Sequence, residues 1–122
     1  MNTQDVANKL IQLCREGKNV DAVDELYAND IVSYEPKGSD MEITEGKAAV
    51  INKNKLWFDM VEEIHGVTIS EPIVSGNFFA CAMDIDVTYK GMGRDTMNEI
   101  CVYEVEDGKI ISERFHYSMQ QA

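Results

Sequence analysis

The hydrophobic pattern changes its period once along the chain, near Gly66, and this change limits the possible folds more than any other feature. Before Gly66, apolar residues recur at the spacing of helices that bury one face. After Gly66, they alternate with polar residues, which is typical of strands with one buried side. The sequence therefore predicts an α+β fold in which helices come first and consecutive strands follow.

Three helices are expected in the first half of the chain. Thr3 is available to cap the first helix, which ends at Gly17. The second and third helices are expected over residues 20–27 and 47–64. Between them, residues 31–35 form a strand-like run that is left to pair at the side of the later sheet.

Four β-rich runs make up the second half of the chain. They cover residues 67–74, 78–89, 95–106 and 109–117. Short joints rich in turn residues separate them, and the Asp107-Gly108 dipeptide favours a two-residue turn in which both φ angles are positive. We therefore expect an antiparallel meander that curls around the helices.

The Asp107-Gly108 turn also predicts which side chains share a face, because hairpin register follows from the turn. Counting back from the turn places Val102 opposite Glu113. One face of this hairpin should then carry Asn98, Ile100, Val102, Glu113, Phe115 and Tyr117. The other face should carry Glu99, Cys101, Tyr103, Ser112, Arg114 and His116.

The preceding strand indicates which of these faces lies inside. Its apolar set must be the inner wall and consists of Phe79, Cys81, Met83, Ile85 and Val87. Asp84 and Asp86 alternate to the outer, solvated side. If Ile100 and Phe115 continue the inner wall, Glu113 becomes a carboxyl group in an apolar interior. Such a group needs a partner or a proton.

The expected outer face offers two features. Glu99 and His116 form a cross-strand polar pair in this register. An apolar patch would lie beside them, formed by Cys101, Tyr103, Val105 and Ile110. A monomer would leave this patch in water, so we expect a homodimer.

Charge and length exclude several classes of function. Residues 1–122 are expected to form one domain, and the 22 acidic against 11 basic residues give a net charge of -11. This charge disfavours nucleic acids and anionic membranes as partners. No signal peptide or long apolar run is visible, which favours a cytoplasmic protein. The three scattered cysteines fit reduced core thiols better than a disulfide frame or a metal site.

Three motifs, in the right order, resemble one superfamily. Residues 26–30 and 33–36, LYAND and SYEP, are similar to the "LYADDA...EDP" passage of ketosteroid isomerases. Residues 45–50 resemble the "G-x-x-A-I" start of the third helix in these families, and residues 106–110 resemble their terminal "DGKI" hairpin. The chain thus resembles nuclear transport factor two, ketosteroid isomerase and the SnoaL-like cyclases. The resemblance implies a cone-shaped, curved, mostly antiparallel sheet wrapped around three N-terminal helices and enclosing a pocket.

The resemblance carries over to the catalytic residues only in part. Glu35, before Pro36, matches the carboxylate that shuttles protons in the isomerases. Their two oxyanion donors fall at Ile11 and Ile100, so ketosteroid isomerase activity is not expected. SnoaL-like cyclases need no cofactor and use a His and an Asp that face the pocket, and His116 on the outer face does not match this pattern.

The candidate site follows from these faces. Glu35 and Glu113 are the candidate catalytic pair, although Glu35 could instead lie in water at the mouth and Glu113 in an internal ion pair. Candidate ligand-binding residues are Trp57, Met83, Ile85, Asn98, Ile100, Val102, Phe115 and Tyr117. No metal or cofactor is expected.

Two functions remain open. One is a pocket for a small apolar or carbonyl-bearing molecule, with an isomerase or cyclase activity based on carboxylate acid-base chemistry. The alternative is a non-enzymatic dimeric interaction module whose pocket is filled by Trp57, Phe115 and Tyr117. An open cavity on the order of several hundred Å³ would favour the first.

Overall fold

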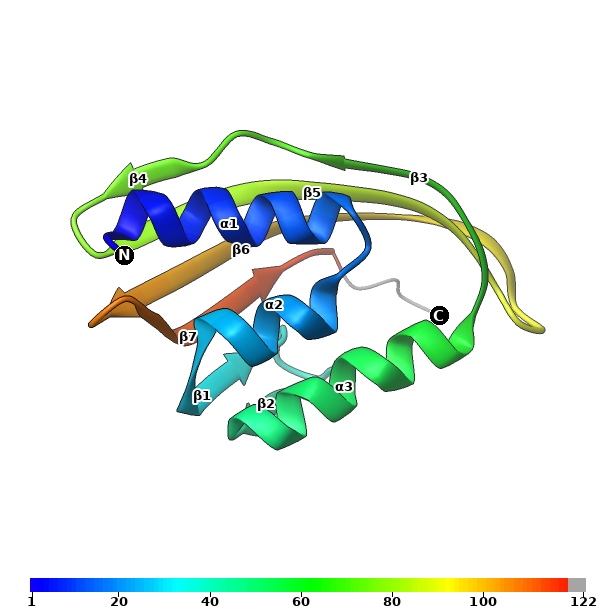
Figure 1. Cartoon of the computed structure of the whole chain (residues 1–122). Helices are drawn as coiled ribbons and strands as arrows, with labels where there is room; N and C mark the ends of the chain where they lie inside the picture. The colour runs from blue at the N-terminus through cyan, green and yellow to red at the C-terminus, as the bar shows by residue number, and fades with distance from the viewer. Residues whose placement is uncertain (119–122) are drawn as a thin grey trace.

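A computed structural model describes residues 1–118, in which three helices pack on a seven-stranded sheet (Figure 1). The helices are α1 (Thr3–Arg15), α2 (Asn19–Leu26) and α3 (Lys47–Met60). The strands are β1 (Tyr27–Tyr34), β2 (Ile43–Glu45), β3 (Val61–Ile69), β4 (Ile73–Ser75), β5 (Phe78–Tyr89), β6 (Gly93–Glu106) and β7 (Lys109–His116).

The sheet is mixed and curved, and it confirms the expected α+β plan. Its strands follow the order β2-β1-β7-β6-β5-β3, and β4 pairs with β5. Within residues 1–118, β1 pairs with β7 in parallel, and the other strand pairings are antiparallel. The long strands β5 and β6 bend around the helices (Figure 1). None of the helices within residues 1–118 is both long and apolar enough to cross a bilayer.

Helix α1 is capped by Asn2 and not by Thr3. The Asn2 side chain accepts a hydrogen bond from the Asp5 backbone N–H at 2.8 Å, and the Asp5 carboxylate accepts one from the Asn2 N–H at 3.3 Å. This reciprocal pair satisfies two donors at the start of the helix. The expectation for Thr3 is wrong because Thr3 is already the first helical residue.

Helix α3 ends at Met60, and the chain continues directly into β3, so the expected helix to residue 64 is wrong. Val61 already has an extended backbone and pairs with Tyr89 of β5. The apolar spacing of residues 61–64 suits a helix, but pairing with the long strand β5 overrides that local preference. The expected strand over residues 67–74 is also divided, because β3 ends at Ile69 and β4 begins after Pro72.

The turn at Asp107-Gly108 has the predicted geometry, with φ angles of 51° and 74°. Next to the turn, Val105 pairs with Ile110, as counting back from a two-residue turn requires. One step further, Glu104 pairs with Ser112, so Ile111 is an extra residue on β7. This β-bulge shifts all later pairs by one residue relative to the expected register.

Because of the bulge, the two faces of β6 are the reverse of those expected from the sequence. Tyr103, and not Val102, lies opposite Glu113. The inner face carries Glu99, Cys101, Tyr103 and Val105, whereas Asn98, Ile100 and Val102 lie on the outer face, contrary to expectation. The inner positions of β5 are as predicted, because they follow from the alternation along β5 itself. Glu113 and Phe115 are also inner residues as predicted, because alternation along β7 continues unchanged after Ile111 and the shift changes only their partners on β6.

The expected outer apolar patch is therefore part of the core. Cys101, Tyr103, Val105 and Ile110 are all buried among core residues. The outer face instead exposes a different apolar set, which consists of Ile73, Phe78 and Ile100. Asp84 is exposed on that face, as expected.

Candidate functional site

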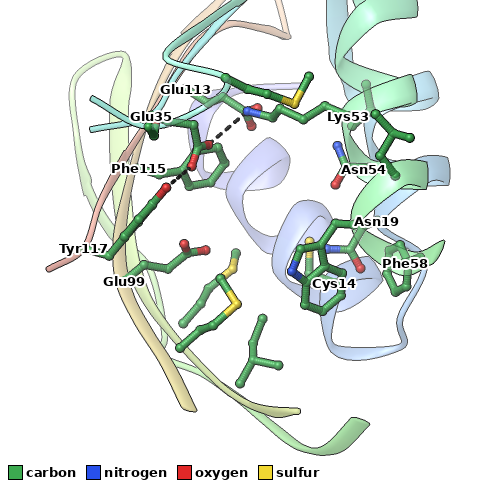
Figure 2. Close-up of a pocket in the computed structure, with 18 of the residues that line it drawn as sticks. Cys14, Asn19, Glu35, Lys53, Asn54, Phe58, Glu99, Glu113, Phe115 and Tyr117 are labelled. Carbon is green, nitrogen blue, oxygen red and sulfur yellow. Dashed lines mark hydrogen bonds and ion pairs between the residues drawn. The ribbon is translucent and has the colours of Figure 1, made fainter. Parts of the chain in front are cut away.

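A cavity of about 490 Å³ lies between the inner face of the sheet and the helices (Figure 2). Its walls combine residues of α1, α2 and α3 with residues of β5, β6 and β7. Four methionines contribute to the lining: Met41, Met60, Met83 and Met97. Methionine adapts its shape to irregular ligands, so these walls suit a largely apolar molecule.

Seven of the ten predicted site residues lie at this cavity, and three do not. The lining includes Glu35, Trp57, Met83, Ile85, Glu113, Phe115 and Tyr117. Asn98, Ile100 and Val102 lie on the opposite side of the sheet because of the bulge at Ile111. Although Trp57, Phe115 and Tyr117 line the cavity, they leave it open.

Glu35 lies directly after β1 and forms the polar end of the cavity with two other side chains. Its Oε2 atom accepts a hydrogen bond from the Lys53 Nζ at 3.0 Å, and its Oε1 atom accepts one from the Tyr117 hydroxyl at 2.8 Å (Figure 2). The Lys53 and Glu35 side chains are 14% and 16% exposed, so this ion pair is largely shielded from water. Glu35 is thus held in place with its charge compensated.

Glu113 is only 2% exposed and is fully hydrogen-bonded. The Tyr27 hydroxyl donates to one of its carboxyl oxygens, and the Ser33 hydroxyl donates to the other at 2.6 Å. Burial raises the pKa of Glu113, while the hydrogen bonds from Ser33 and Tyr27 act in the opposite direction. The expected rise in pKa is therefore present, but the alternative of an internal ion pair does not describe the site, because hydroxyl groups are its direct partners.

Ser33 joins these two groups into one network. The Lys53 Nζ donates to the Ser33 Oγ at 2.7 Å, and the Ser33 hydroxyl donates to Glu113. A continuous path of hydrogen bonds thus runs from buried Glu113 to Glu35 at the cavity. Strands β1 and β7 and helix α3 must all be in place for this path to form.

Glu99 is the acidic residue that sequence reasoning placed on the wrong face. Its side chain points from β6 into the cavity (Figure 2). Burial raises the pKa of Glu99 to about 7, and the charge of Glu35 adds to the rise. The Cys101 thiol, at 3.7 Å, is a weak hydrogen-bond partner for it. Glu99 can therefore gain or lose a proton near neutral pH.

A signal for Glu99 was present in the sequence. The β5–β6 pairing, counted from the turn after Tyr89, places Met83 opposite Glu99. Since Met83 was assigned to the inner wall, this second hairpin would have placed Glu99 inside as well. Lys53 had a comparable signal, because it lies on the same helical stripe as Val50 and Trp57.

The remaining polar candidates lie away from the cavity lining. His116 is exposed and lies opposite Ile100, so the expected pair with Glu99 is wrong. His65 contacts Glu63 at 2.8 Å and Thr88 at 2.7 Å. Within residues 1–118, no group of three His, Cys, Asp or Glu side chains is arranged to hold a metal ion.

The three cysteines are free and buried. Cys14 lines the cavity, and burial raises the pKa of its thiol to about 12. A thiol with this pKa stays protonated at neutral pH and is a poor nucleophile. Cys14 therefore contributes apolar surface to the cavity wall.

Comparisons with known proteins agree on one family of folds. Residues 1–117 match the family described as the SnoaL-like domain. A Mesorhizobium loti protein, named as a SnoaL-like polyketide cyclase, is 37% identical with a TM-score of 0.89, and the match covers 96% of this chain and 100% of the other. No protein with a curated description matches the chain significantly.

Two more distant structures show the fold alone. A Xanthomonas campestris protein with a cystatin-like fold is 19% identical with a TM-score of 0.82, over 98% of this chain and 93% of the other. A Catenulispora acidiphila protein with a ketosteroid isomerase-like fold, solved in complex with trimethylamine, is 18% identical with a TM-score of 0.74, over 93% and 85%.

Proposed function

Because the chain belongs to the SnoaL-like domain family, we propose that its cavity binds a small, largely apolar, carbonyl-bearing compound and that Glu99 moves a proton on it. One observation carries this proposal: a part-buried carboxyl group with a pKa of about 7 points into an open, mainly apolar cavity. A general base is most effective when its pKa lies near the working pH. The chemistry needs no group beyond the side chains of the protein.

The polar end of the cavity supplies a complementary charge. When Glu99 takes a proton from the carbon next to a carbonyl group, negative charge develops on the carbonyl oxygen. Lys53 uses two N–H donors for Glu35 and Ser33, which leaves its third donor for that oxygen. Its ammonium charge, shielded from water, stabilises the developing oxyanion.

Glu113 has a positioning role in this proposal. Both of its oxygens already accept hydrogen bonds from Tyr27 and Ser33. It orients Ser33, and Ser33 accepts a hydrogen bond from Lys53. In this proposal Glu99, and not the expected pair of Glu35 and Glu113, carries the proton. Glu35 binds Lys53 directly, and Glu113 positions it through Ser33.

Deuterium exchange tests this proposal without knowledge of the natural substrate. In D₂O, the wild-type protein should catalyse exchange at the carbon next to the carbonyl of at least one cyclic ketone in a panel that includes 2-tetralone, as measured by mass spectrometry. Glu99→Gln should lower the rate about 100-fold, because general acid-base catalysis typically contributes that much. Asp84→Asn is the matched control, since it removes an exposed carboxylate from the outer face.

The exchange experiment has two outcomes that would contradict the proposal. One is a wild-type rate equal to that of buffer for every ketone in the panel. The other is a Glu99→Gln rate equal to that of Asp84→Asn.

We also propose that the protein forms a homodimer in which a second copy of the chain packs against the outer sheet face. Ile73, Phe78 and Ile100 are 76%, 47% and 50% exposed there, and they lie on the three adjacent strands β4, β5 and β6. Light scattering at micromolar concentration should give the mass of a dimer, and Ile100→Asp should give a monomer. Met92→Asp changes an 81% exposed side chain in the β5–β6 turn and should remain dimeric. A monomeric wild-type protein would refute this interface.

A further inference from the structure

The charge of the cavity wall is strongly unbalanced. Its ionisable acidic residues are Glu35, Asp40, Glu99 and Glu113, and Lys53 is its basic residue. The Lys53 ammonium is already committed to Glu35 at 3.0 Å. The whole chain also carries a net charge of -11, which attracts cations toward the protein.

Glu99 forms no ion pair among residues 1–118, and the charge of Lys53 opposes the rise in its pKa less than burial and Glu35 cause it. Its hydrogen-bonding contact is the Cys101 thiol at 3.7 Å, and Met83 lies opposite it on β5. An ionised carboxylate that faces apolar walls is costly unless a positive charge or a strong donor compensates it. A ligand that brings its own positive charge would remove this cost.

Aromatic rings form the other part of the wall. Trp57, Phe58, Phe115 and Tyr117 all line the cavity. The Phe115 ring already has the Lys53 ammonium above it, at 5.2 Å from the ring centre. Aromatic faces attract organic cations, and this attraction grows when water is excluded. The walls can therefore hold the apolar surface of an amine without opposing its charge.

We propose that the ligand of this cavity carries a positively charged nitrogen, as a protonated or quaternary amine, which pairs with Glu99 while its apolar part contacts the aromatic and methionine walls. This inference rests on the proposed function, because it takes the cavity to be a small-molecule site and narrows the substrate class to carbonyl compounds that bear an amine. A positive charge beside the carbonyl also makes the neighbouring C–H more acidic, so the two roles of Glu99 are compatible.

Two probes of the same shape test the role of charge. Phenyltrimethylammonium and tert-butylbenzene differ in having a charged nitrogen or a neutral carbon at the branch point. Trp57 is the only tryptophan of the chain and lines the cavity, so its fluorescence reports binding there. The cation should bind the wild-type protein at least about 10-fold more tightly than the neutral probe.

Glu99→Gln should remove this preference to within about 2-fold while leaving the affinity for tert-butylbenzene unchanged, and Asp84→Asn should retain it. Equal affinities in the wild-type protein, or a preference that survives in Glu99→Gln, would overturn the cation inference while ketone exchange could still succeed. A clear cation preference without any ketone exchange would instead refute only the proposed catalysis. Failure of both probes to bind would overturn the inference and count against the cavity as a binding site.

Discussion

A chain that carries Asp107→Pro should lose at least about 3 kcal/mol of folding stability. Asp107 has a φ angle of 51°, whereas the proline ring fixes φ near -65°. The β6–β7 turn would have to adopt another geometry, and the pairing that places Glu113 and Phe115 inside the sheet starts from this turn. Since small domains are stable by only about 5–15 kcal/mol, the urea midpoint should fall sharply.

Two substitutions serve as controls for the turn. Asp107→Asn should cost little, because asparagine tolerates a positive φ angle. Asp84→Ala changes an exposed side chain on the outer face and should also cost little. If Asp107→Pro melted at the same temperature as these two variants, the turn would not be the element that fixes the hairpin register.

Glu113→Ala should destabilise the protein by about 4 kcal/mol, since it removes the acceptor of two buried hydroxyl groups. Tyr27 and Ser33 are 4% and 0% exposed, so water cannot readily replace the lost carboxylate. Each unsatisfied buried donor typically costs about 1–3 kcal/mol, and the removed side chain also leaves a void. Urea unfolding of the variant and the wild type at neutral pH measures this loss.

Glu113→Gln is the matched control. Because its amide does not titrate, comparison with it shows whether ionisation of Glu113 raises or lowers the stability of the wild-type protein. An amide of the same shape accepts one hydrogen bond and donates another, so this variant should remain folded. In the wild-type protein the pKa of Glu113 is raised, so the folded state favours the protonated form. Its contribution to stability is therefore full below the unfolded pKa of about 4.3 and is lost as pH rises through the folded pKa.

The stability of Glu113→Gln relative to the wild type should accordingly increase from pH 4 upward and become constant above the folded pKa. Urea midpoints measured from pH 4 to pH 8 give this difference. If the wild-type protein instead gained stability over the Gln variant as pH rose, the pKa of Glu113 would be lowered by folding. The hydroxyl donors and Lys53 would then affect this pKa more than burial does.

Features that depend on one local pattern could be predicted from the sequence. The alternation along residues 78–89 predicts the inner wall of β5, and the Asp107-Gly108 dipeptide predicts the turn between β6 and β7. Glu113 is expected inside because it shares a face of β7 with Phe115, and this alternation holds although Ile100, the other residue assigned to that face, lies outside. These predictions needed no knowledge of how distant segments meet.

Features that depend on competition between segments could not be predicted in the same way. The bulge at Ile111 has no glycine or proline to mark it, and both faces of β6 are apolar around Cys101 and Val102, so alternation could not reveal the shift. The end of α3 at Met60 depends on pairing with β5, which the spacing of Val61 and Ile64 does not encode. The parallel neighbour of β1 likewise becomes visible only in the folded sheet.

The parallel pairing of β1 with β7 has a consequence for the order in which the molecule forms. Tyr27 and Ser33 meet Glu113 across more than half of the chain, with sequence separations of 86 and 80 residues. Closing such a long loop costs entropy before any contact compensates it, which makes this a slow step in folding. During synthesis, β1 therefore cannot form its parallel pairing until β7 has left the ribosome. A nascent chain shorter than residue 113 can form the contacts of Lys53 with Glu35 and Ser33, but it lacks the hydrogen bonds that Tyr27 and Ser33 donate to Glu113.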